Sequence, residues 1–246
     1  MTVDDVFLGR VGHDLRGELA TMVAGVHYLL RYEAGLGETG RQMLERVDGA
    51  GKRLKKLLDE LEDASWIEGP GERRPARDAL SVSGLLHEAL ASLERSASAR
   101  EVTVGVSLPA DLPDIEGDAE LCVAAFEHEL DFAIARTPRG GAVSVVAALG
   151  AATPAEEGSV VVTMTDAGRP LDEALLARLF EPFVEREALP PAEPGARRRE
   201  RLGLGLAIAR GILAAHGGSL AAAPAPGGQG LRLTSRWQAA PRSRAT

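Results

Sequence analysis

The chain is poor in cysteine and has no long apolar run, and both shortages exclude classes of protein. Cys122 is the single cysteine among 246 residues, so no disulfide can form within the chain, and a buried structural thiol is expected. No apolar run is long enough to span a bilayer. The first residues also lack the basic stretch and apolar core of a secretory signal. We therefore expect a cytoplasmic protein without membrane insertion.

Basic residues are also fewer than acidic ones. Lysine and arginine number 28 against 36 acidic residues, which gives a formal net charge of -8. Non-specific binding to nucleic acid needs a basic footprint, so we expect no nucleic-acid partner. A nucleotide ligand stays possible, because a phosphate site needs only local donors.

Residues 1–66 are expected to form a helical hairpin. Apolar side chains recur at steps of three and four in two runs, and a glycine-rich break at 35–40 separates the runs. A lone hairpin buries its apolar stripes poorly. Pairing of two hairpins into a four-helix bundle is the simplest remedy, so we expect a homodimer. The stripes consist of Phe7, Val11, Leu15, Leu19, Met22, Val26 and Leu29, and of Leu44, Val47, Leu54, Leu57, Leu58 and Leu61.

The remainder of the chain predicts an α+β domain. Residues 67–79 are rich in glycine, proline and charge, which is typical of a linker, and residues 239–246 are expected to form a disordered tail. Between them, over 80–238, helical and strand patterns alternate, and this mixture predicts a sheet with helices on one face. Helices are expected at 82–97, 119–137 and 202–216, and strands at 102–106, 143–149, 160–165 and 230–237.

His13 and Asp14 stand together in the first helical segment. At about 100° per residue, His13 falls away from the apolar stripe, so its imidazole should face solvent. A neutral histidine offers a nucleophilic ring nitrogen. Asp14 could hydrogen-bond the other nitrogen and make the ring more basic. The plain alternative is a solvated surface histidine.

Four short motifs follow in order near the C-terminal end. Asp166-Ala167-Gly168 comes directly after a predicted strand, and Gly203-Leu204-Gly205 opens a predicted helix. Backbone N–H groups at a helix start, together with the helix dipole, suit a phosphate group. The other two motifs are Leu179-Phe180-Glu181-Pro182-Phe183-Val184 and His216-Gly217-Gly218. A single glycine pair before a helix is weak evidence, but the ordered set is specific.

The ordered motifs resemble those of two-component histidine kinases, whose ATP-binding domain has the Bergerat fold of gyrase, Hsp90 and MutL. The resemblance covers about residues 5 to 237. It implies that His13, within His13-Asp14-Leu15-Arg16, is phosphorylated, and that Asp14 assists proton transfer. A homodimer and a response regulator receiver domain are the implied partners. Gly17 replaces a threonine that supports dephosphorylation of the regulator in the family.

The same resemblance assigns the nucleotide contacts. Asp166 should accept a hydrogen bond from the adenine amino group, because a carboxylate can only accept. Gly168 should let the backbone approach the base, and Gly203 and Gly205 should line the phosphates. The segment 185–202, rich in proline, alanine, glutamate and arginine, corresponds to the loop that closes over ATP in the family.

The Mg²⁺-binding motif departs from the family pattern. Thr137-Pro138 and Ala133 fix the alignment, which places Phe132 where the family has the asparagine that holds Mg²⁺. A phenyl ring cannot ligate this cation. Glu127, Glu129 and Asp131 are the candidate replacement ligands. Glu127 and Asp131 share a helix face and form the leading pair, whereas Glu129 would need a rotation of the helix. His128 is a candidate base or phosphate contact. Arg136, one place after the family's basic position, is assigned to nucleotide binding.

Three functions are compatible with these residues. The leading one is ATP-dependent autophosphorylation of His13, followed by phosphoryl transfer to an aspartate of a response regulator. The second is a dimeric pseudokinase that binds a response regulator or a kinase without transferring phosphate. The third is a Bergerat-fold ATPase that uses its site for conformational switching.

Overall fold

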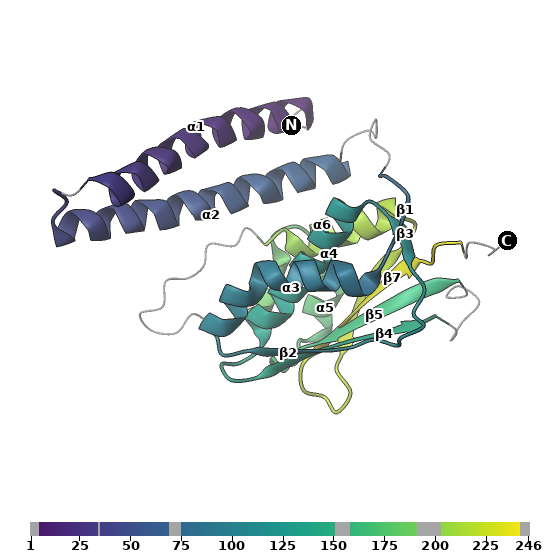
Figure 1. Cartoon of the computed structure of the whole chain (residues 1–246). Coiled ribbons are helices and arrows are strands. Elements are labelled where there is room, and N and C mark those ends of the chain that lie inside the picture. Colours follow the sequence, from purple (N-terminus) through teal and green to yellow (C-terminus); the bar gives the residue numbers. More distant parts are fainter. Residues whose placement is uncertain (1–4, 34, 69–74, 151–157, 191–202, 242–246) are drawn as a thin grey trace. The chain divides into compact units, whose positions relative to one another are not determined.

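The computed structural model describes residues 5–33, 35–68, 75–150, 158–190 and 203–241 (Figure 1). Within the first two ranges, the side chains of 5–14, 16, 18, 52–53 and 56–68 lie outside the described part. The chain divides into two compact units, a helical one formed mainly by residues 1–71 and a mixed one formed by most of the rest. No helix in the described part is long and apolar enough to cross a membrane.

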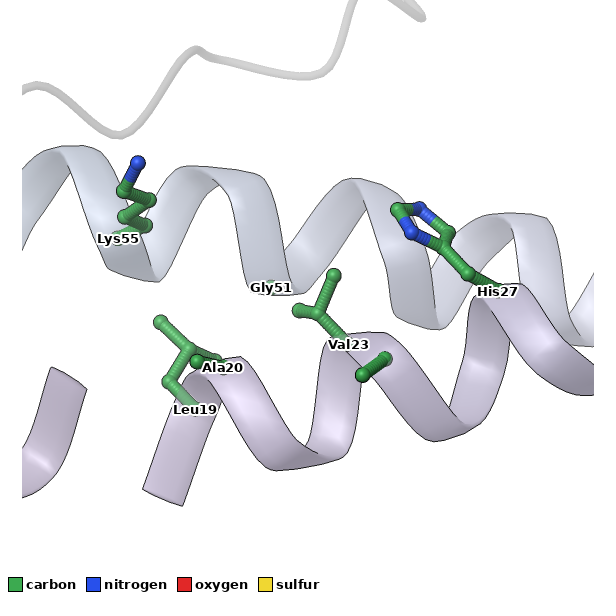
Figure 2. A pocket seen from close by; sticks show the side chains of 7 residues that line it. Leu19, Ala20, Val23, His27, Gly51 and Lys55 are labelled. Atoms are coloured by element: carbon green, nitrogen blue, oxygen red, sulfur yellow. The ribbon is translucent and has the colours of Figure 1, made fainter. Parts of the chain in front are cut away.

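The helical unit is a hairpin of α1 (Asp5–Tyr32) and α2 (Glu38–Glu68). The two helices pack closely at Gly51, because a Cβ atom there would lie 2.6 Å from Cγ2 of Val23. Leu19, which also lies near Gly51, is buried, and so is Val26 one helical stretch further along α1. A shallow pocket opens beside it, and Figure 2 shows Leu19, Val23 and His27 of α1 beside Gly51 and Lys55 of α2. The predicted pair of helices is therefore confirmed.

Much of the apolar stripe of α1 stays exposed within one chain. Leu15 is 50% exposed, Met22 64% and Leu29 39%. On α2, Val47 and Leu54 are similarly exposed. Nothing in the described part of a single chain covers these side chains.

The mixed unit is built on a five-stranded sheet of order β2-β4-β5-β7-β6. Edge strand β2 pairs parallel with β4, and the other neighbours are antiparallel. Alternate residues of β4 and β7 are buried, as expected of strands with one covered face. The strands are β2 (Thr103–Ser107), β4 (Ala142–Leu149), β5 (Ser159–Thr165), β6 (Ser219–Pro224) and β7 (Leu231–Gln238).

Three helices cover one face of this sheet (Figure 1): α3 (Val82–Ala99), α4 (Ala119–Arg136) and α6 (Gly205–Ala215). The carboxylate of Asp118 caps α4 by accepting the N–H of Leu121. Thr137 ends α4 before a proline, and its hydroxyl donates to the Ala133 carbonyl. In the core, Phe126 of α4 packs on Trp237 of β7 with ring centroids 5.2 Å apart. The predicted α+β class, with helices on one face, is confirmed.

Several short elements were not predicted. Strand β1 (Asp78–Leu80) pairs with β3 (Ile115–Gly117), and α5 (Glu173–Arg178) and the 3-10 helix η1 (Val184–Ala188) follow β5. The predicted linker 67–79 contains the last residues of α2 and the start of β1. The predicted tail is hydrogen-bonded at its start, because the N–H groups of Ala239 and Ala240 donate to carbonyls of Gly158 and Asp114.

Cys122 lies in α4 and is fully buried. Burial raises the pKa of its thiol to about 12. The prediction of a buried structural thiol is thus confirmed.

Candidate functional site

The C-terminal half of α4 lies along the whole candidate site. It carries Glu127, His128, Asp131 and Arg136, the residues that the sequence assigned to metal, base and nucleotide contacts. Glu127 and His128 are half-buried, whereas Asp131 is buried. From His128 to Arg136 the helix rises about 12 Å at about 1.5 Å per residue. One helix can therefore contact both ends of an extended nucleotide.

Asp166 and Arg136 form a buried ion pair at one end of the site. Nε of Arg136 donates to Oδ2 of Asp166 over 2.7 Å, and the two side chains are 1% and 2% exposed. The other guanidinium nitrogens donate to the backbone carbonyls of Ala188 and Arg169. All three guanidinium nitrogens of Arg136 are therefore hydrogen-bonded, one of them to the predicted adenine acceptor Asp166.

The second oxygen of Asp166 is engaged as well. Its Oδ1 accepts the N–H of Gly168 over 2.7 Å and that of Leu231 over 3.2 Å. A Cβ atom at Gly168 would lie 2.8 Å from this oxygen and 2.9 Å from the Arg136 carbonyl. Gly168 therefore has to be glycine here for close packing around the ion pair.

The other end of the site is the N-terminus of α6. Gly205 begins the helix, and the N–H of Leu206 donates to Oε2 of Glu185 over 2.7 Å. A Cβ atom at Gly205 would lie 3.1 Å from Nδ1 of His128 and 3.3 Å from Oε2 of Glu185. Gly205, His128 and Glu185 are thus brought together. A carboxylate occupies the position at the helix start where a phosphate was expected.

Gly203 shapes the turn before α6. It adopts a φ of +86°, and its carbonyl accepts the N–H of Phe183 over 2.7 Å. A side chain there would meet Arg186 and the Phe183 carbonyl. Gly203 therefore connects the helix start to the segment that carries Glu185.

The sequence did not predict that Glu185 lies at the start of α6, nor that Arg136 pairs with Asp166. Glu185 belongs to a segment interpreted only as a loop, and its hydrogen bond closes 21 residues further along the chain. The Arg136–Asp166 pair joins residues 30 apart. No local pattern reports contacts at such separations.

A Mg²⁺ ion can find at most a partial site here. Phe132 is 1% exposed and packs in the core, with the Arg136 guanidinium 5.7 Å from its ring centroid. In the described part of the chain, no three His, Cys, Asp or Glu side chains gather into a metal cluster. Mg²⁺ in nucleotide sites is held by one or two carboxylates and the phosphates. Glu127 and Asp131 are two carboxylates one turn apart on α4, the first half-buried and the second buried.

Glu129 is the third acidic residue of α4 that the sequence offered as a Mg²⁺ ligand, and it lies in the core. It is fully buried, and neither of its oxygens has a hydrogen-bond partner among the described residues. The hydroxyl of Ser235 is directed to the Val162 carbonyl instead. Burial raises the pKa of Glu129 to about 8.

His216 ties two helices together. Its Nδ1 lies 2.7 Å from the Ile212 carbonyl, and its Nε2 accepts the N–H of Asp118 over 3.1 Å. The ring therefore links the end of α6 to the start of α4. His13 and Asp14 belong to α1, but their side chains lie outside the described residues.

Residues 117–241, half of the chain, match the model of the family described as histidine kinase-, DNA gyrase B- and HSP90-like ATPases. The sensor protein DivL of Caulobacter vibrioides is 29% identical over 90% of this chain and 26% of its own length. The sensor-like histidine kinase SenX3 of Mycolicibacterium smegmatis is 27% identical over 90% of this chain and 54% of its own length.

The fold agrees with solved structures. Full-length ShkA in complex with AMPPNP superposes with a TM-score of 0.75 at 20% identity, over 98% of this chain and 47% of that one. The chain spans between a quarter and about half of the curated relatives named above. The relatives named above are sensor proteins and sensor-like histidine kinases. The chain itself belongs to the histidine kinase-, DNA gyrase B- and HSP90-like ATPases.

Proposed function

We propose that the protein transfers the γ-phosphoryl group of ATP to His13 and then to an aspartate of a response regulator receiver domain. It would do so as a cytoplasmic homodimer. The observation that supports it most is that residues of α4 lie at both ends of the candidate nucleotide site. Arg136 of α4 meets Asp166, which is the proposed adenine acceptor. His128 lies beside Gly205, at the helix start proposed for the phosphates.

The transfer to His13 needs a nucleophile and a proton acceptor. A neutral imidazole attacks the γ-phosphorus through one ring nitrogen, the bond from that phosphorus to the bridging oxygen breaks, and ADP leaves. Asp14 is proposed to hold the other ring nitrogen and to stabilise the positive charge that develops on the ring. His128 is proposed as a phosphate contact or base.

Charge neutralisation at the phosphates is assigned to Mg²⁺ and this chain's own residues. Glu127 and Asp131 are the proposed ligands, and the ion, when bound, lowers the electrostatic cost of phosphoryl transfer. The backbone N–H groups at Gly205 and Leu206 would hold the phosphates through the helix start. In the structure, Leu206 already makes that kind of contact with a carboxylate.

Incubation with γ-labelled ATP tests this proposal. The full chain should acquire an acid-labile, alkali-stable label, as expected of phosphohistidine. His13→Ala should abolish the label, whereas His27→Ala, a histidine of the same helix, should keep it. A purified receiver domain should then remove the label from the protein and acquire it.

Absence of label with either Mg²⁺ or Mn²⁺ would contradict the kinase proposal. Binding of a receiver domain without any label would favour the pseudokinase. Nucleotide hydrolysis that is insensitive to His13→Ala would favour the ATPase switch.

A further inference from the structure

The candidate nucleotide site is filled at both ends by side chains of the chain itself. At the base end, the guanidinium of Arg136 lies on Asp166. At the phosphate end, the carboxylate of Glu185 accepts the N–H of Leu206 at the start of α6. Each side chain carries the kind of group that a nucleotide would offer at that point: an N–H donor for Asp166 and an anionic oxygen for the helix start.

At the base end, the chain itself occupies most of the acceptor positions of Asp166. A carboxylate has about four acceptor positions, and Asp166 uses three of them for Arg136, Gly168 and Leu231. The fourth lies on the oxygen that already accepts from Arg136. Because the Asp166 side chain is only 2% exposed, an adenine amino group cannot reach it until Arg136 moves.

The phosphate end is equally closed. Glu185 is 3% exposed, and Gly205 and Leu206 are buried with it. A phosphate bound at the same N–H group would place like charge against this carboxylate. The two anions compete for one site, because a helix start favours negative charge but binds it only within the first turn.

One short segment contributes to both contacts. We define the latch as residues 183–188, which comprise η1 and the preceding Phe183. Glu185 of the latch caps α6, and the Ala188 carbonyl accepts Nη1 of Arg136 over 2.7 Å. Release of this segment would therefore free both ends of the site together.

The latch begins at a strained residue. Phe183 adopts a φ of +71°, which is unusual for a side chain other than glycine, and its ring is 58% exposed. An L-residue in this conformation is strained, because its Cβ atom crowds the following carbonyl oxygen. The exposed ring offsets little of that strain through packing, so this end of the latch can reorganise at low cost.

We propose that the latch and Arg136 hold the nucleotide site in a self-occupied state that excludes ATP until both side chains are displaced. This inference rests on the proposed function, because it concerns the same nucleotide site. The apparent affinity for nucleotide is then the affinity of the open site multiplied by the fraction of molecules in which it is open. Any event that opens the latch would switch the kinase on.

Calorimetric titration of the full chain with adenosine and with ADP tests the proposal. Arg136→Ala should raise the affinity for both ligands by about tenfold or more, because the base end is freed. Glu185→Gln should raise the affinity for ADP by a similar factor and leave adenosine unchanged. Arg139→Ala and Glu187→Gln are the matched controls, since they change the same charges at exposed positions nearby, and they should alter neither affinity.

Thermal unfolding of each variant is measured without ligand, to establish that the variant folds. If Arg136→Ala does not fold, Arg136→Lys replaces it. This variant keeps the charge but loses the planar fork, and adenosine affinity should still rise. The Glu185→Gln comparison stands independently of both, because it leaves the buried ion pair in place.

The outcomes separate this proposal from the function itself. A wild type that binds ADP and a folded Arg136 variant that binds adenosine no better would overturn self-occupation and leave the nucleotide function standing. If Glu185→Gln and Glu187→Gln raise ADP affinity equally, the effect comes from net charge and not from the position of Glu185. That result would overturn the part of the proposal that concerns the phosphate end. If no folded variant binds any nucleotide, both proposals fail.

Discussion

At the scale of single residues, Glu129 makes stability depend on pH. The folded protein retains this proton up to about pH 8, whereas an unfolded glutamate loses it near its ordinary value of 4.5. The folded state thus binds more protons across this interval. The contribution of Glu129 to stability should be fully present below about pH 4.5 and should be lost as the pH rises toward 8, by up to about 1.4 kcal/mol per pH unit.

Urea unfolding of the wild type and Glu129→Gln from pH 5 to 9 measures this dependence. The variant cannot ionise, so it should lose the slope and become the more stable protein at pH 8 to 9. Glu94→Gln, an exposed glutamate on α3, should follow the wild-type curve. Parallel curves for wild type and Glu129→Gln would refute the prediction.

Asp166 should confer preference for adenine over guanine. Adenine presents an amino donor where guanine presents a carbonyl, and a carboxylate accepts only from the donor. Asp166→Asn should therefore reduce ATP affinity and remove the preference over GTP in competition titrations. It should also lower the free energy of unfolding by about 3–5 kcal/mol, because Arg136 keeps a buried charge without its partner.

Asp111→Asn, in an exposed loop, should change neither quantity. Equal affinity of the wild type for ATP and GTP would contradict the adenine role. Loss of stability without any change in selectivity would leave Asp166 with a structural role alone.

At the scale of elements, α4 is expected to supply the acidic residues of phosphoryl transfer. Asp131→Ala and Glu127→Ala should each reduce labelling of His13 by about tenfold or more, while ADP affinity changes little, since Mg²⁺ acts mainly on the phosphates. Single-turnover labelling beside calorimetry separates the two effects. Glu120→Ala, at the exposed start of α4, is the control.

Replacing Phe132 by the asparagine of the family pattern should lower the stability of the protein. Phe132 is a fully buried core side chain, so Phe132→Asn should cost about 3–5 kcal/mol of stability. If wild type is active and indifferent to both acidic substitutions, the metal has no protein ligand on this helix.

The elements themselves show what a sequence can reveal. Periodicity and the Thr137-Pro138 stop predicted α4 closely, and alternation predicted β4 and β5. Strand β1 has three residues and exists because of its pairing with β3, some 35 residues later. Local pattern carries no record of such pairing. For the same reason the sequence did not predict the contact of Glu185 with the start of α6, which the fold brings about.

At the scale of the whole molecule, the exposed stripe of the hairpin predicts a dimer. Met22 is 64% exposed, and no described residue of the same chain covers it. Met22→Glu should convert a dimer into a monomer at micromolar concentration in light scattering, because a charge in an apolar bundle seam is costly. Val146→Glu, on the sheet of the other unit, should leave the dimer intact. A monomeric wild type would refute the prediction.

Removal of the hairpin should leave a folded monomer. The truncation has to begin by residue 75, because β1 starts at Asp78 and pairs with β3. A start at residue 80 would remove a strand that the second unit uses. Circular dichroism and light scattering of residues 75–246 check both parts of this expectation.

The burial of Trp237 gives the molecule a built-in optical reporter. Its indole is fully enclosed between Phe126 and His216, and the ring nitrogen has no hydrogen-bond partner among the described residues. Such an indole should emit at short wavelength and shift to the red when water enters. Because the second tryptophan, Trp66, belongs to α2, a Trp66→Phe protein would report through fluorescence on the sheet unit alone. The contacts that join α4, α6 and β7 could then be followed in time as nucleotide is mixed in.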